Sequence, residues 1–232
     1  MTKLLTTAFT RAVADYHELL NRRYPERRTR LLVADTYGLS RAQRTVLHRG
    51  VFSDEVNRRR SAARCSLDSL PAGYPQALAV DYCNVVYTIM NYLFGRIVYI
   101  STDGFLRDNG KDYRKLYREG EFMKAVHLLA DTVTRLEVET VELFIDSGFP
   151  EKSGEAVPFG DYGTSLISGR YPRLRITISD MTDRLMNASR ATLKATADSR
   201  IIDRSSSPLV DLPRAVLESA YHPDFPDLGK LI

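Results

Sequence analysis

From residue 77 onward, short apolar runs alternate with longer stretches of helical character. The helical stretches are clearest at residues 121–136 and 209–221. Strands that alternate with helices are typical of a parallel sheet covered by helices on both faces. The pattern therefore predicts an α/β fold with a parallel sheet for residues 77–232. The expected strands are ALAV (77–80), RIVYIS (96–101), TVELFI (140–145), LRITIS (174–179) and LKAT (193–196).

The composition is that of a globular protein with a substantial core. The chain has 232 residues, of which 44% are apolar and 27% charged, enough for one large domain or for a core domain with a small appendage. It has no apolar run of about 18 residues, so no transmembrane helix or membrane partner is expected. Asp15, His17 and Glu18 stand where a signal peptide needs its small-residue cleavage region. We therefore expect a cytoplasmic protein.

The residues that usually bind zinc are sparse. Cys65 and Cys83 lack metal-site spacing, and the four histidines are scattered along the chain. A metal would therefore be held by oxygen ligands, which favours Mg²⁺ or Mn²⁺. The sequence has no phosphate-binding P-loop, no dinucleotide fingerprint and no G-x-S-x-G elbow.

Residues 1–70 form a basic, helical front end with about twice as many Lys and Arg as Asp and Glu. Apolar residues at helical spacing precede a second helical run that ends at Gly38. Ser40 and Gln43 then form a capping-box signature, which gives the outline of a helix-turn-helix. A packed helical appendage is the commoner explanation of such an outline, and a module that contacts nucleic acid is the alternative. A Ser-, Pro- and Gly-rich linker ends near residue 76 and separates this module from the α/β domain.

Acidic residues closely follow the expected strands. In a parallel sheet, the carboxyl ends of the strands share one edge, where ligands gather. Carboxylates brought together there repel and raise one another's pKa unless a cation neutralises them, and Mg²⁺ or Mn²⁺ suits such oxygen ligands. The alternative is that each aspartate only caps the following helix. The acidic residues that follow the expected strands are Asp81, Asp103, Asp146, Asp180 and Asp198, and Asn84 lies close to Asp81 in the sequence.

Two basic segments are candidate phosphate contacts. Lys152 and Ser153 precede a glycine at an expected helix start, which can bind phosphate or be an ordinary turn. In residues 102–119, basic residues alternate with aromatic ones, as in a groove that holds a single strand and stacks its bases. A solvated loop has the same composition. The basic residues singled out in this second segment are Arg107, Lys111 and Arg114.

Four segments together resemble a known family: LAVDYCNVVYTI, STDGFLRD, VELFIDSGFPEKSGE and TADSRIID. They are similar to an uncharacterised, largely prokaryotic domain family whose core resembles PIN/NYN-type metal-dependent ribonucleases, over roughly residues 22–220. The resemblance implies a PIN/NYN-like core that uses one or two Mg²⁺ or Mn²⁺ ions to cleave a phosphodiester. It implies metal ligation by Asp81, Asp103, Asp146 and Asp198, with Asn84 orienting a ligand or water.

The leading hypothesis is therefore a metal-dependent nuclease that acts on RNA rather than DNA, helped by the N-terminal helical module. The helix expected after the first strand, VVYTIMNYLFG, carries no acidic residue, although PIN/NYN-like domains commonly place a metal ligand there. This departure motivates an alternative, a non-catalytic nucleic-acid-binding protein on a degenerate nuclease fold. A protein-interaction scaffold is a third hypothesis. The sequence leaves open the substrate, the number of metals and whether the chain forms a homo-oligomer.

Overall fold

The computed structural model describes residues 4–67, 70, 77–110, 119–136, 138–147 and 173–232. The chain forms two compact units, each built from separated segments. The first unit comprises residues 1–62, 95–111 and 224–232, and the second comprises residues 63–94 and 112–223. Residues 95–111 and 224–232 thus belong with the N-terminal helices, although the sequence pattern alone groups them with the α/β domain. None of the described helices is both long and apolar enough to cross a membrane.

The second unit contains a six-stranded sheet in the order β1-β8-β7-β2-β5-β6, in which every neighbouring pair is parallel. The α/β fold with a parallel sheet is therefore confirmed. Four strands match the predicted apolar runs: β2 (Ala77–Asp81), β5 (Thr140–Asp146), β6 (Leu174–Ser179) and β7 (Leu193–Ala195). The pattern missed β1 (Arg64–Cys65) and β8 (Leu209–Val210), because two residues are too few to show a periodicity.

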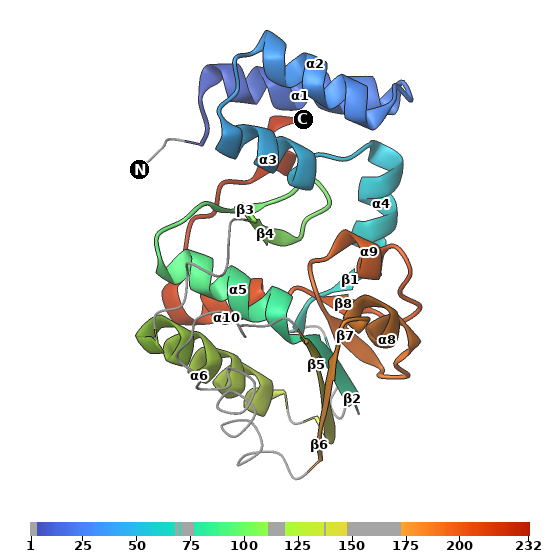
Figure 1. Cartoon of the computed structure of the whole chain (residues 1–232), viewed down its shortest axis with the longest axis vertical. Helices are drawn as coiled ribbons and strands as arrows, with labels where there is room; N and C mark the ends of the chain where they lie inside the picture. Colours follow the sequence, from blue (N-terminus) through green and yellow to red (C-terminus); the bar gives the residue numbers. More distant parts are fainter. Residues whose placement is uncertain (1–3, 68–69, 71–76, 111–118, 137, 148–172) are drawn as a thin grey trace. The chain divides into compact units, whose positions relative to one another are not determined.

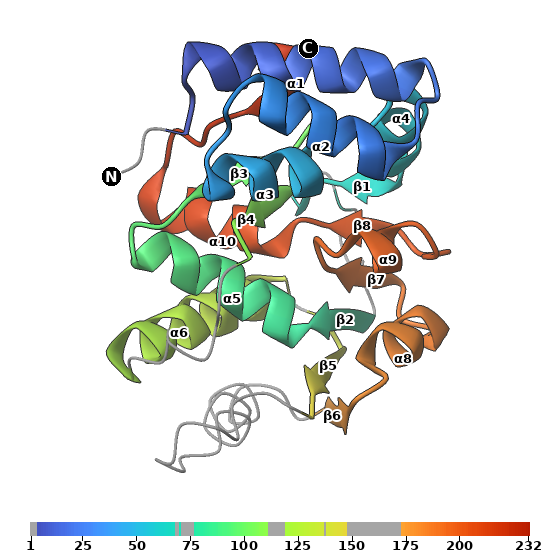
Figure 2. The same ribbon diagram turned by 45° about the horizontal axis from the view of Figure 1, so that its top comes forward.

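Helices cover both faces of this sheet (Figure 1). On one face lie α5 (Tyr82–Leu93), α6 (Glu119–Arg135) and α10 (Leu212–Tyr221), which contact one another. On the other lie α8 (Thr182–Ala188) and α9 (Ser199–Ile202). There Met186 and Ile201 pack with Ala79 and Phe144 of the sheet in a buried cluster. Figure 2 shows α5 beginning directly at the carboxyl end of β2, so the strand end and the helix start share one site.

The expected strand at residues 96–101 exists, but its assignment to the parallel sheet is wrong. Its core, β3 (Val98–Ile100), pairs antiparallel with β4 (Leu106–Asp108) in a separate two-stranded sheet of the first unit. The connection between the two strands is a tight turn in which Gly104 has a φ of 84°. A turn this short returns the chain antiparallel, whereas a parallel partner needs a crossover of a dozen residues or more.

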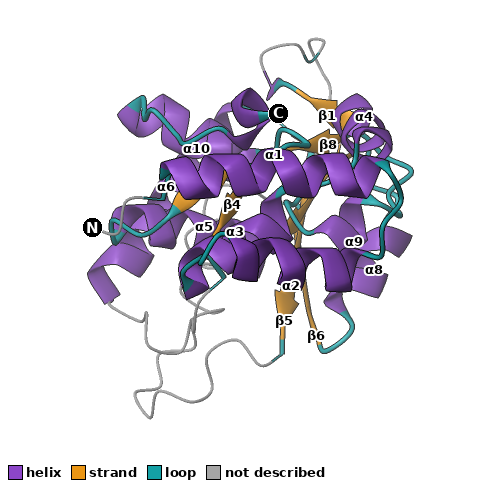
Figure 3. Cartoon of the chain, turned by 90° about the horizontal axis from the view of Figure 1, so that it is seen from above, coloured by secondary structure: helices purple, strands orange, loops and turns teal. Residues whose placement is uncertain are grey.

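The helices of the first unit agree closely with the sequence pattern. They are α1 (Thr7–Asn21), α2 (Glu26–Thr36), α3 (Arg41–Gly50) and α4 (Asp54–Ala63), and a 3₁₀ helix, η3 (Leu228–Leu231), ends the chain. The predicted capping box of α3 is confirmed, since the Ser40 hydroxyl and the Gln43 side chain each accept the other residue's backbone N–H. Seen from above, α1 and α2 run side by side (Figure 3).

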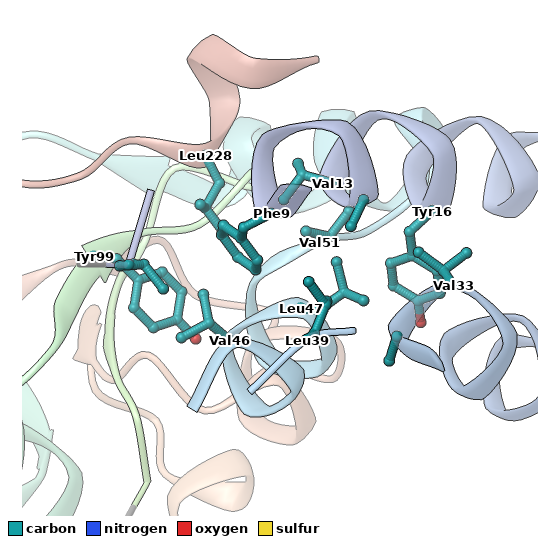
Figure 4. Packing of buried hydrophobic residues seen from close by; sticks show 13 residues of the cluster. Phe9, Val13, Tyr16, Val33, Leu39, Val46, Leu47, Val51, Tyr99 and Leu228 are labelled. Atoms are coloured by element: carbon teal, nitrogen blue, oxygen red, sulfur yellow. The ribbon is translucent and has the colours of Figure 1, made fainter. Parts of the chain in front are cut away.

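The core of the first unit joins all three of its segments (Figure 4). Phe9, Val13 and Tyr16 of α1 pack with residues of α2 and α3, and Tyr99 of β3 and Leu228 of η3 complete the cluster. Each of these five side chains is fully buried. The N-terminal helices therefore share one core with the β3–β4 hairpin and the chain's last turn.

Candidate functional site

The carboxyl edge of the parallel sheet gathers aspartates from neighbouring strands. Asp81 ends β2 and Asp146 ends β5, which is paired with β2. Asp198 follows β7, the neighbour of β2 on its other side. The negative charges of Asp146 and Asp198 both raise the pKa of Asp81, so both carboxylates lie close enough to Asp81 to interact with it electrostatically. Three of the five aspartates singled out in the sequence thus come together.

Asp81 is the buried member of this group, with 6% of its surface exposed. Its Oδ1 accepts the backbone N–H of Asn84 at 3.4 Å and caps α5, and its Oδ2 accepts the hydroxyl of Thr196 at 2.8 Å. Burial, with further contributions from the charges of Asp198 and Asp146, raises the pKa of Asp81 to about 7. The hydrogen bonds from the Thr196 hydroxyl and from the backbone N–H of Asn84 lower the pKa of Asp81 and partly offset this rise.

Asn84 and Thr196 hold the two strand ends together. The Asn84 Oδ1 accepts the backbone N–H of Ala197 at 2.9 Å, which ties the first turn of α5 to the segment after β7. The Thr196 hydroxyl oxygen accepts the backbone N–H of Asp198 at 3.0 Å. The Asp198 Oδ1 in turn accepts the backbone N–H of Arg200 at 2.7 Å and caps α9. The capping role considered for Asp81 and Asp198 is therefore real, and each carboxylate keeps acceptor capacity beyond it.

A fourth carboxylate, Asp183, was missed by the sequence pattern. Burial and the charges of Asp198 and Asp146 raise its pKa, and its carboxylate lies 3.9 Å from a guanidinium nitrogen of Arg200. Asp183 lies in the first turn of α8 rather than at a strand end, and its closeness to the end of β6 was the available signal. We name Asp81, Asp146, Asp183 and Asp198 the acidic edge cluster. Asp180, which follows β6 directly, is exposed.

Cys83 lies against this cluster. The backbone N–H of Asp146 donates to the Cys83 sulfur at 3.3 Å, and burial is the main cause that raises the pKa of the thiol. The thiol is therefore kept protonated at neutral pH, which does not favour a role as a nucleophile or a metal ligand.

Asp103 and Arg107, both singled out in the sequence, lie in the first unit and belong to a different arrangement. Asp103 is completely buried. Its Oδ1 accepts Arg107 Nη1 at 2.6 Å, and its Oδ2 accepts Arg107 Nη2 at 2.9 Å and Arg60 Nη1 at 3.0 Å. We name these three residues the buried ion-pair cluster. Burial favours the neutral acid, but the two arginines and the Ser101 hydroxyl outweigh it and lower the pKa of Asp103.

These contacts correct two expectations. Asp103 stands outside the acidic edge cluster, and its oxygens are taken up by guanidinium groups and a hydroxyl rather than offered to a metal. Arg107 is 3% exposed, and the ring of Phe52 lies 5.2 Å from its guanidinium carbon. It therefore lines no solvated groove for phosphates. The other predicted phosphate contacts lie outside the described residues: Lys111, Arg114, Lys152 and Ser153.

The chemistry of the acidic edge cluster suits a hard divalent cation, since its donors are carboxylate oxygens with a carboxamide beside them. Within the described part of the chain, no three His, Cys, Asp or Glu side chains lie close enough together to hold a metal ion directly. Mg²⁺ usually keeps several of its waters and takes only one or two carboxylates. A Mg²⁺ or Mn²⁺ ion at this cluster would therefore have at most two of these side chains as direct ligands and would bind the others through water.

Comparisons with known proteins give two family matches. Residues 74–215 match the model of a domain of unknown function, DUF5616, and residues 8–62 match that of a protein of unknown function, DUF434. No curated protein and no solved structure matches the chain. The first match covers more than half of the chain and contains the whole acidic edge cluster. Neither description names an activity, so the PIN/NYN-like core stays a prediction.

Proposed function

Because this chain belongs to the DUF5616 family, whose description names no activity, we propose a function from the chain's own residues. The proposed function is that of a Mg²⁺- or Mn²⁺-dependent phosphodiesterase that cleaves RNA at the acidic edge cluster. The single observation that carries this proposal is that Asp81 is buried beside two other carboxylates, which raises its pKa. A buried carboxyl whose nearest charged neighbours include two more carboxylates destabilises the folded chain when it ionises. A bound cation reverses that effect, and such an arrangement is common at functional sites.

At most two of Asp81, Asp146 and Asp198 would bind the metal directly and the third would do so through water, with Asp183 adding negative charge nearby. When bound, the cation supplies positive charge against a phosphodiester and against the clustered carboxylates. The RNA preference rests on the resemblance to PIN/NYN-type ribonucleases.

The chain's own residues have separable tasks in this proposal. The Thr196 hydroxyl and the backbone N–H of Asn84 each donate to one oxygen of Asp81, so the buried carboxylate is oriented before any ligand binds. Asp146 is exposed, and Asp183 and Asp198 are half-buried, so a substrate can reach these three members from solvent.

The test is a calorimetric titration with Mn²⁺, followed by an RNA cleavage assay with and without EDTA. We compare the wild type with Asp81→Ala and Asp198→Ala. Asp227→Ala is the matched control, because Asp227 also caps a helix through a backbone N–H but lies in the first unit. We expect Mn²⁺ binding and EDTA-sensitive cleavage in the wild type and the control, and neither in the two cluster variants. Unchanged cleavage in both cluster variants, with circular dichroism showing intact folds, would sink the assignment.

A second candidate function is non-catalytic binding of nucleic acid. It is favoured by the lack of three metal-binding side chains at direct ligand distance among the described residues, and by the absence of an acidic residue in α5. Under this alternative, RNA binding falls steeply with salt and is indifferent to EDTA. The cleavage assay separates the two functions, since only the first predicts shortened RNA.

A further inference from the structure

The second unit contains a pocket of about 690 Å³ that the proposed nuclease site does not use. It is lined by the carboxyl ends of β1 and β8, the last turn of α6 and one side of α10. The helices α6 and α10 contact each other on the same face of the sheet (Figure 1). The volume lies within the range of small-molecule sites, roughly 300–1,000 Å³.

Three arginines from three different elements line this pocket, which we name the arginine pocket: Arg64 of β1, Arg135 of α6 and Arg214 of α10. The Arg64 Nε is buried and has no hydrogen-bond partner among the described residues. A buried donor without a partner costs free energy that a bound acceptor recovers. The unpartnered donor is one observation in favour of a ligand with acceptor oxygens.

The Arg135 guanidinium is held in place by hydroxyl groups, and no carboxylate among the described residues forms an ion pair with it. Its Nη2 donates to the hydroxyl oxygens of Thr132 and Ser219, each at 3.2 Å. Hydroxyl groups orient a guanidinium but carry no opposing charge. The side chain is also exposed, so it remains accessible from solvent.

The acidic groups that line the pocket do not balance the three arginines. The Glu218 carboxylate accepts Arg214 Nε at 2.8 Å, and Asp211 caps α10 by accepting the backbone N–H of Arg214 at 3.2 Å. Among the lining residues that the structure describes, three arginines stand against these two acids, which leaves an excess positive charge, and His222 also lines the pocket. The pocket is therefore electrostatically suited to an anion.

We propose that the arginine pocket binds the phosphate of a phosphomonoester. Guanidinium groups recognise phosphate oxygens through paired, charge-assisted hydrogen bonds. Three of them match the three terminal oxygens of a phosphomonoester better than the two of a carboxylate. β8 and β1 are the second and third strands from β2, so the pocket lies roughly 10–14 Å along the sheet edge from Asp81. Phosphate binding here stands whether or not the acidic edge cluster hydrolyses RNA.

The experiment is a calorimetric titration of the full chain, in EDTA, with AMP, inorganic phosphate and adenosine. We expect AMP and phosphate to bind and adenosine to bind far more weakly. Arg135→Gln should weaken AMP binding by about tenfold or more, because a charge-assisted hydrogen bond is lost. Arg190→Gln is the control, since Arg190 is exposed and does not line the pocket. Arg64→Gln is a second variant and should also weaken AMP binding. If this change within β1 disturbs folding, Arg135→Gln alone decides the test.

Two short RNAs, one with a 5′-phosphate and one with a 5′-hydroxyl, identify the source of the phosphate. Tighter binding of the 5′-phosphorylated RNA that depends on Arg135 supports the end of an RNA as ligand. Binding of AMP without any preference between the RNAs supports a free nucleotide or other small phosphate. The proposal is overturned if the wild type binds neither AMP nor phosphate at millimolar concentrations, or if Arg135→Gln binds AMP as tightly as the wild type does.

Discussion

Replacing Asp81 with asparagine should stabilise the metal-free protein at alkaline pH, which is unusual for a change at a buried polar residue. Asparagine has nearly the same shape, and its oxygen can still accept the backbone N–H of Asn84. Its amide can donate to the hydroxyl of Thr196, so both contacts of the wild-type side chain have counterparts. What the variant loses is the ionisation of the buried group.

The size of the effect follows from the pKa of Asp81, which is about 7 in the folded chain against an ordinary value of 3.8. Between these two values the folded chain keeps a proton that the unfolded chain has released. The free energy of unfolding therefore falls as pH rises through this window and levels off above the folded pKa. A difference of about three between the two pKa values corresponds to a loss of about 4 kcal/mol. Asp81→Asn should avoid that loss at pH 8 and should match the wild type near pH 4.

The measurement is urea unfolding followed by circular dichroism from pH 4 to pH 9 in EDTA. Asp227→Asn serves as control, because it removes a capping carboxylate from the first unit and leaves the acidic edge cluster intact. If the wild type and Asp81→Asn lose stability in parallel as pH rises, then burial of Asp81 is not the cause and the reasoning fails.

The same urea unfolding experiment, repeated with Mg²⁺ in place of EDTA, tests whether Asp81 binds the metal. At pH 8 and a concentration 100 times its Kd, the ion should raise the wild-type free energy of unfolding by about 2.7 kcal/mol. Asp81→Asn should gain much less, since its amide carries no charge to attract the ion. Equal stabilisation of both proteins by Mg²⁺ would remove Asp81 from the proposed metal site.

Three further predictions concern the first unit, and urea unfolding measures each. Asp103→Asn should cost about 3–5 kcal/mol, because it removes the buried carboxylate that pairs with both guanidinium groups. A cost below about 0.5 kcal/mol, as for a surface substitution, would contradict it. Gly50→Ala should cost about 1–3 kcal/mol, since the added Cβ would lie 2.5 Å from a ring carbon of Tyr99. Ser40→Ala should cost about 1 kcal/mol through loss of the capping box, and Ser40→Asp should restore most of it.

The parts of this protein that a sequence pattern captures are those fixed by local structure. Asp81, Asp146 and Asp198 could be singled out because each closely follows an apolar run, and a parallel sheet brings such positions to one edge. Asp103 follows an apolar run in the same way, but one of its partners, Arg60, lies 43 residues away. No local pattern reveals a pairing over that distance, so a structural aspartate and a site aspartate look alike in the sequence.

The same limit explains the other differences. Arg107 lies in a segment whose basic and aromatic residues are typical of a solvated groove, yet its burial depends on Phe52 and Asp103. Asp183 was missed because it lies in the first turn of α8, four residues after β6 ends, and so did not stand directly at a strand end. The grouping of residues 95–111 and 224–232 with the N-terminal helices is likewise a tertiary property, decided by the packing of Tyr99 and Leu228.

The core that joins α1 to Tyr99 and Leu228 bears on how the protein is made. Domains generally fold as units while the chain is synthesised, N-terminal ones first. Here α1, α2 and α3 can pack on one another early, but their core lacks Tyr99 and Leu228 until those residues have been synthesised. The second unit, whose segments end at residue 223, holds all of its strands before the first unit can close. The core of the first unit is thus completed after the strands of the second, and until then the apolar surface that Tyr99 and Leu228 cover is open to chaperones or to aggregation.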